Sequence, residues 1–334
     1  MRRAFLKRLG VAGTQSFLSA PSLAFLAAPS LAQITGFPAR SLRMIVPFAA
    51  GGAADVVARL MAQGMGEQLG QPVTVENRGG SGGVLGSEAA LAAPADGYTF
   101  VFHTLSSAVL NAGLYCNLSF DVRRAFQPVS LVGLVPNVVL VNARLPAQTL
   151  LDLVALLRAS PGRYSYASSG NGTITHLSAH LLLGMIGAQA LHVPYRGSGP
   201  ALQDLAAGNV DLMVDTMAGV LGLVQGGQLR ALAMTTPRRS PALPEVPTAA
   251  EAGLSGYESY NWHAIFATRN TPAPVVERLE QAAMAAVRAP AIRLRLEQVG
   301  VEPSGGGAAE LTAFWDQQTA LWIPLIRASG ATAE

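Results

Sequence analysis

The sequence has very few of the residues that several common chemistries need. Cys116 is the only cysteine among 334 residues, which excludes an internal disulfide and a cysteine-rich metal site. Lys7 is the only lysine, so a chain without its N-terminal segment has no amine for Schiff-base or pyridoxal-phosphate chemistry. Charged residues make up 13% of the chain and hydrophobic residues 50%, a composition that excludes disorder.

The excess of positive charge belongs to the N-terminus. The chain has 23 basic and 20 acidic residues, and four of the basic ones lie within residues 1–32, before the first acid, Asp55. Removing that segment leaves 19 basic against 20 acidic residues (23 − 4 = 19), a net charge near −1. The remainder therefore gives no support to binding of nucleic acid or of a membrane surface through basic patches.

Residues 1–32 have the pattern of an export signal: a basic start, an apolar middle interrupted by polar residues, and SLA at 30–32 as a cleavage site. The run RRAFLK at 2–7 resembles the twin-arginine motif, with Met1 where serine or threonine is usual. The general secretory route remains open. We expect cleavage near Ala32 and a mature chain that works in the periplasm.

About 302 residues (334 − 32) remain, enough for two domains. Apolar runs predict strands, and the longer segments between them have helical patterns. The predicted strands are 42–48, 73–76, 98–103, 138–141, 164–167, 191–194, 210–214, 229–234 and 264–267, and the predicted helices are 54–68, 150–159, 175–186, 200–207 and 275–287. This alternation predicts an α/β fold with largely parallel sheets.

Three polar loops follow predicted strands, where open α/β sheets collect ligands. Residues 49–55 read AAGGAAD and lead into a helix, so exposed N–H groups and the helix dipole favour an anion there; Asp55 fits a helix-start role better than a ligand contact. Residues 168–173, SSGNGT, offer hydroxyls and an amide, and residues 103–107, HTLSS, are similar. The first loop therefore predicts a site for a carboxylate or phosphate, and the other two predict contacts with a small polar ligand.

Four further side chains have both a ligand-binding and a structural interpretation. Arg196 suits a carboxylate clamp or a solvated surface position. Asp215 suits a hydrogen bond from a ligand hydroxyl or amine, or a turn at a strand end. Tyr195 and Trp262 suit either a pocket wall or core packing.

A catalytic alternative rests on GGSGG around Ser81, which fits the Gly-x-Ser-x-Gly pattern of hydrolases. Asp204, Asp211 or Asp215 followed by His263 would complete the order Ser, Asp, His. Four glycines around one serine also suit a flexible turn or an anion-binding nest, which is the simpler interpretation.

Metal and nucleotide sites have weaker support. His176 and His180 have i, i+4 spacing but lack the adjacent glutamate of a zinc motif, so packing or capping roles suit them better. No phosphate-loop or dinucleotide fingerprint occurs. We expect neither a metal nor a cofactor.

The chain resembles the Bug-type receptors, the extracytoplasmic substrate-binding proteins of tripartite tricarboxylate transport systems. The resemblance runs through nearly the whole mature chain. Its blocks are IVPFAAGG at 45–52 with Asp55 and Arg59, VENRGGSGG at 75–83, DGYT at 96–99, YASSGNG at 166–172 with His176-Leu177, VPYRG at 193–197 with Asp204-Leu205, LRALA at 229–233 and LPEVPTAAEAGL at 243–254. The family often has proline where Ala50 and Gly79 stand and lysine where Arg196 stands.

This resemblance implies a periplasmic-binding-protein fold of type II, with two doubly wound α/β domains that close on a ligand like a flytrap. Residues 40–134 with 255–334 would form one domain, and residues 135–254 the other. The loops at 49–53 and 168–173 would then face each other and hold a carboxylate, partly through ordered water.

We therefore predict a non-catalytic, monomeric receptor for a small carboxylate, which is an organic acid, an aromatic acid or an acidic amino acid. The receptor would pass this ligand to a membrane transporter or report it to a sensor. The alternative is an exported serine hydrolase using Ser81. The predicted ligand contacts are Ala49, Gly51, Gly52, Ala53, Thr104, Ser106, Ser107, Ser169, Asn171, Gly172, Thr173, Tyr195, Arg196, Asp215 and Trp262.

Overall fold

The computed structural model describes residues 36–115, 117–329 and 332. The predicted export signal, its cleavage point and Cys116 lie outside the described residues. Among the helices of the described part, none is long and apolar enough to cross a membrane.

The first sheet has a parallel part and an antiparallel part. Strand β1 (Leu42–Val46) lies between β2 (Val73–Asn77) and β3 (Thr99–Thr104) and is parallel to both. Strand β9 (Tyr260–Thr268) is antiparallel to β3 on its other side. Strand β10 (Glu302–Gly306) joins this sheet by pairing with β4 (Phe126–Asn142).

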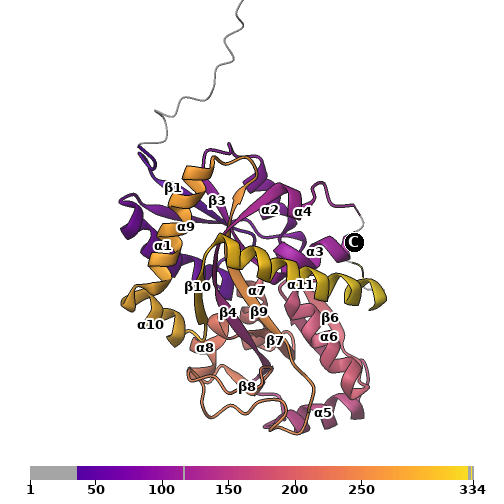
Figure 1. Ribbon diagram of the computed structural model, residues 1–334. Helices are drawn as coiled ribbons and strands as arrows, with labels where there is room; N and C mark the ends of the chain where they lie inside the picture. Colours follow the sequence, from indigo (N-terminus) through magenta and orange to yellow (C-terminus); the bar gives the residue numbers. More distant parts are fainter. Residues whose placement is uncertain (1–35, 116, 330–331, 333–334) are drawn as a thin grey trace, which may run out of the picture. The chain divides into compact units, whose positions relative to one another are not determined.

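Helices cover both faces of the first sheet (Figure 1). Because side chains alternate along a strand, Met44 faces one core and its neighbour Ile45 the other. The first core lies under α1 (Ala53–Leu69), α9 (Ala273–Arg288) and α10 (Pro290–Gln298); the second lies under α2 (Val84–Leu91), the π-helical turn η3 (Ser106–Leu110), α3 (Asn111–Leu114), α4 (Val122–Ala125) and α11 (Ala308–Ser329).

The second sheet repeats this plan. Strand β5 (Ser165–Ser168) lies between β6 (Leu191–Pro194) and β7 (Leu212–Thr216), parallel to both, and β8 (Leu229–Met234) joins through β4. Its two cores are covered by α5 (Leu150–Ala159) and α6 (Ile174–Ile186) on one face and by α7 (Ser198–Ala207) and α8 (Met217–Gln225) on the other.

One long strand belongs to both sheets. Strand β4 (Phe126–Asn142) pairs antiparallel with β9 and β10 in the first sheet and with β7 and β8 in the second (Figure 1). Its register shifts near Pro128 and Gly133, as expected where proline or glycine interrupts a ladder. These breaks explain why the sequence predicted only residues 138–141.

All nine predicted strands and all five predicted helices are present. The strands at 191–194 and 229–234 and the helix at 150–159 have the predicted ends, and the ends of the others differ. The prediction of largely parallel sheets is wrong for β4 and β9, which pair only antiparallel. Gly208 ends α7 with a left-handed φ of 85°, and α7 starts at Ser198, two residues before the predicted helix at 200–207. The division into residues 40–134 with 255–334 and residues 135–254 stays a prediction.

Candidate functional site

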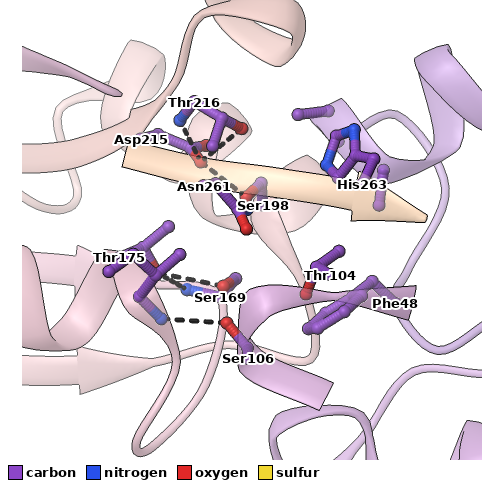
Figure 2. A pocket seen from close by; sticks show the side chains of 14 residues that line it. Phe48, Thr104, Ser106, Ser169, Thr175, Ser198, Asp215, Thr216, Asn261 and His263 are labelled. Carbon is purple, nitrogen blue, oxygen red and sulfur yellow. Dashed lines mark hydrogen bonds between the residues drawn. The ribbon is translucent and has the colours of Figure 1, made fainter. Parts of the chain in front are cut away.

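A polar cavity lies where strand ends and helix starts from both sheets meet (Figure 2). Its lining is Phe48, Gly52, Ala53, Ala54, Thr104, Ser106, Ser169, Ile174, Thr175, Ser198, Asp215, Thr216, Asn261 and His263. The space inside it that the centre of a water molecule can reach is about 20 Å³, enough for about one water. The walls therefore have to separate before a larger molecule enters.

The loop after β1 brings the start of α1 to this cavity. Gly52 precedes the helix and supplies no side-chain cap, so the first-turn N–H groups, those of Ala53 and Ala54 among them, have no acceptor within the helix. The Gly51 N–H donates to Asp55 Oδ2 at 3.0 Å, and Arg59 pairs with Asp55 Oδ1 at 2.9 Å. Although burial opposes them, these bonds hold the pKa of Asp55 below its usual value, which fits its predicted helix-start role.

The loop at 168–173 is held by its own hydrogen bonds. Thr175 Oγ1 accepts from the Ser169 N–H at 2.9 Å and lies 2.9 Å from the hydroxyls of both Ser169 and Thr173. The Gly172 N–H donates to His176 Nδ1 at 3.0 Å, so His176 has a capping role, as predicted. Ser169 and Thr175 face the cavity, whereas Gly172 and Thr173 do not line it.

The third loop joins the two sheets. Ser106 Oγ accepts from the Ile174 N–H at the start of α6, at 2.9 Å. Ser107 Oγ lies 2.9 Å from His103 Nδ1 and accepts from the Thr104 N–H, so it fixes the turn and does not line the cavity. Thr104 Oγ1 is buried and has no hydrogen-bond partner among the described residues.

Two ionisable side chains line the cavity, and both are fully buried. Asp215 Oδ1 accepts from Ser198 Oγ at 2.9 Å and from the Thr216 N–H at 2.7 Å, whereas Oδ2 has no partner within the described chain. Burial raises the pKa of Asp215 to about 6. Both ring nitrogens of His263 also lack partners there, and burial lowers the pKa of His263 to about 3, so the ring is neutral at physiological pH. Thr104, Asp215 and His263 thus bring four buried polar atoms without partners to one cavity.

A second, more open concavity lies on the other side of the 168–173 loop. It is lined by Ser81, Gly82, Tyr115, Gly170, Asn171, Pro194, Tyr195, Arg196 and Pro200. Tyr195 donates its hydroxyl to Asp204 Oδ2 at 2.7 Å. Arg196 is exposed, and its backbone carbonyl accepts from the Ala49 N–H at 3.2 Å. The structure therefore places Asn171, Tyr195 and Arg196 in a different hollow from Asp215.

Of the residues predicted as ligand contacts, the cavity brings together Gly52, Ala53, Thr104, Ser106, Ser169 and Asp215. The N–H groups of Ala49 and Gly51 donate to Arg196 O and Asp55 Oδ2. Trp262 lies in the core against Phe314. The sequence reasoning missed Phe48, Ala54, Ile174, Thr175, Ser198, Thr216, Asn261 and His263 as lining residues. Phe48, Ile174 and Thr175 directly flank the predicted loops and Ala54 lies within one, so extending each loop by two residues would have found these four. The other four lie outside all three loops: Ser198, Thr216, Asn261 and His263.

The residues of the hydrolase alternative do not come together in the described part of the chain. Ser81 has φ 48°, the kind of strained backbone a nucleophile turn uses, but it lines the second concavity whereas His263 lines the first. None of the candidate carboxylates, Asp204, Asp211 and Asp215, orients His263, because neither ring nitrogen of His263 has a hydrogen-bond partner among the described residues. Close packing explains the glycines instead, since a Cβ on Gly79 would lie 2.4 Å from Arg196 O.

Comparison with known proteins agrees with this architecture. Residues 57–331 match the model of the tripartite tricarboxylate transporter family receptor. Protein BugT of Bordetella pertussis is 36% identical over 297 residues, which cover 88% of this chain and 91% of BugT. The solved structure of R. palustris Rpa4515 with adipate has a TM-score of 0.85 at 34% identity, over 89% of this chain and 99% of that one. MatC from Rhodopseudomonas palustris with bound malate has a TM-score of 0.82 at 31% identity, over 87% of this chain and all of that one. The predicted resemblance to Bug-type receptors is thus confirmed: the chain belongs to the tripartite tricarboxylate transporter receptor family of periplasmic binding proteins.

Proposed function

We propose that this protein is a non-catalytic receptor that binds a small carboxylate in the cavity between its two sheets. The observation that carries the proposal is the convergence of Thr104, Asp215 and His263, whose buried polar atoms lack partners within the described chain. Buried polar groups without partners are rare in native proteins because each costs free energy, so a group of them at one cavity indicates a missing ligand. The adipate and malate of the two related structures are ligands of the proposed class.

The proposed site binds an acid with neutral donors. No lysine or arginine lines the cavity, so the ligand carboxylate would be held by the first-turn N–H groups of α1, the hydroxyls of Thr104 and Ser169, and the ring of His263. Of the four expected backbone contacts this drops Ala49 and Gly51, and it keeps Gly52 and Ala53 and adds Ala54. Bridging waters would complete the shell when the ligand is small.

The narrow cavity supports the flytrap motion that the sequence suggested. Its walls come from both sheets, and about 20 Å³ of water-accessible space does not admit a dicarboxylate. We therefore propose that residues 40–134 with 255–334 move away from residues 135–254 to admit the ligand. Asn171, Tyr195 and Arg196 in the neighbouring concavity would meet the ligand on its way in.

The biological setting follows from the family. We infer that the export signal is cleaved near Ala32, and that the mature monomer works in the periplasm. There it delivers its acid to the membrane components of a tripartite transporter or reports it to a sensor. A binding role needs no turnover, and the unoriented His263 supports the absence of hydrolase activity.

A binding screen with one matched pair of variants tests the proposal. The purified chain is screened by thermal shift against mono-, di- and tricarboxylates, aromatic acids and acidic amino acids. A ligand at 100 times its dissociation constant adds about 2.7 kcal/mol of stability. Thr104→Val removes a hydroxyl that has no partner among the described residues, so it should leave the free protein as stable or more stable yet weaken the best acid about 10-fold.

The control for that variant is Thr74→Val, which makes the same change on β2, where the hydroxyl donates to Leu42 O at 3.1 Å. It should leave the affinity unchanged. Absence of any hit, or equal affinities for Thr104→Val and the parent protein, would contradict the proposed site. Turnover of an activated ester that Ser81→Ala abolishes would favour the hydrolase instead.

A further inference from the structure

Building on the proposed function, we propose that Asp215 binds the ligand as a neutral acid: Oδ2 carries a proton and donates it in a hydrogen bond to a carboxylate oxygen of the ligand. The receptor would then capture its anion together with one proton. The alternative chemistry is an ionised Asp215 that accepts a hydrogen bond from a hydroxyl or ammonium group of the ligand.

The hydrogen bonds around Asp215 match a carboxylic acid. All hydrogen bonds that Asp215 receives from the described residues go to one of its oxygens. Asp215 Oδ1 accepts from Ser198 Oγ, from the Thr216 N–H and, at 3.4 Å, from Thr216 Oγ1. Oδ2 receives none from the described residues, although it is buried. An ionised carboxylate attracts donors to both oxygens, whereas a protonated one accepts through its carbonyl oxygen and donates through its hydroxyl.

The charges around Asp215 also favour the neutral form. His263 on β9 is the other ionisable group in the cavity, and it is neutral. On α1, Asp55 is already paired with Arg59, and Arg196 before α7 is exposed in the neighbouring concavity. The residue opposite Asp215 on β4 is Val138. The described residues of these elements therefore offer no cation that could neutralise an ionised Asp215 next to the ligand carboxylate.

A bound anion beside a buried acid strengthens this preference. Burial already raises the pKa of Asp215 to about 6 in the free protein, and a ligand carboxylate at hydrogen-bond distance raises it further. Above the pKa of the free protein, binding then requires uptake of a proton. The affinity should fall about tenfold for each pH unit until the pKa of the complex is reached.

The test is calorimetric titration of adipate and malate at pH 6.5, 7.5 and 8.5 in buffers of different ionisation enthalpy. We expect the parent protein to take up close to one proton per ligand and to lose about 100-fold in affinity between pH 6.5 and 8.5. Asp215→Asn places an N–H donor where the acid has its O–H, so its affinity should be independent of pH and exceed that of the parent protein at pH 8.5. Asp211→Asn, the same change of charge just before β7, should behave like the parent protein.

Two results would overturn the inference. One is binding without proton uptake together with a loss of more than tenfold in Asp215→Asn at every pH, which identifies an ionised acceptor. The other result needs no ligand. It is a carbon-13 NMR signal of the Asp215 carboxyl, assigned by its absence from the spectrum of Asp215→Asn, that titrates below pH 5. The Asp215 signal could also titrate near pH 6 in a protein that binds neither adipate, malate nor any other acid of the screen. That result would contradict the proposed function but support a protonated Asp215 below that pH.

Discussion

Gly199, the second residue of α7, tests whether the close approach of the two sheets matters for binding. A Cβ built at this position lies 2.0 Å from Ala50 O, in the loop after β1. Ordinary contact begins at 3.4 Å, so Gly199→Ala has to push α7 and the loop apart by about 1.4 Å (3.4 − 2.0). Overpacking of this kind costs about 1–3 kcal/mol.

That cost should fall on the closed, liganded form. If the two sides separate in the free protein, the new methyl meets nothing there, and the free energy of unfolding changes little. Binding then becomes weaker by the full penalty, which corresponds to about 5- to 150-fold in the dissociation constant. Calorimetric titration with the best acid of the screen, beside thermal unfolding without ligand, measures both quantities.

The matched control is Gly222→Ala in α8, where a Cβ meets nothing within 4 Å. It should stabilise the helix by about 0.5–1 kcal/mol and leave the affinity unchanged. An affinity of Gly199→Ala equal to that of the parent protein would refute the reasoning, because α7 and the first loop could then not be in contact around the ligand.

Three further outcomes follow from the same contacts. Because the folded-state pKa of Asp215, about 6, is above its ordinary 3.8, raising the pH from 4 to 7 should destabilise the parent protein relative to Asp215→Asn by up to about 3 kcal/mol in denaturant melts. Burial lowers the pKa of His176 to about 3 and of His192 to about 4, so stability should fall as the pH drops from about 6.5 towards 4, and His192→Gln should reduce that slope in circular dichroism melts. Ser106→Ala removes the acceptor of the Ile174 N–H and should lower the free energy of unfolding by about 1 kcal/mol in the same melts. The control Ser255→Ala changes an exposed serine outside the helices and strands and should have little effect.

The parts of the fold that were predictable are those with local signals. The capping box of Thr149 and Asp152 and the left-handed Gly208 mark helix ends that depend on neighbouring residues alone. Strand β4 was recognised only in part because its two halves belong to different sheets, with Pro128 inside the first half and Pro136 where the halves meet. Tertiary packing decides which strands such a segment pairs with, and local sequence patterns do not indicate that pairing.

For the site, the sequence identified the right loops but not which groups in them are free. Gly51 and Ala49 look like ligand donors until the structure shows that Asp55 and Arg196 accept their hydrogen bonds. His263 shows the converse, because nothing in an apolar strand indicates that its ring faces a cavity. Contacts between residues far apart in the chain help to create the site, such as the hydrogen bond from the Leu105 N–H to Asn261 Oδ1 across 156 residues. These contacts follow from the fold rather than from spacing.

The most direct test of the account is a crystal structure of the protein with its tightest-binding acid. The account predicts a ligand carboxylate at about 2.7–3.2 Å from Thr104 Oγ1 and Asp215 Oδ2, with the walls closed around it. A ligand seated instead beside Arg196 and Tyr195, with the atoms of Thr104, Asp215 and His263 still without partners, would contradict it.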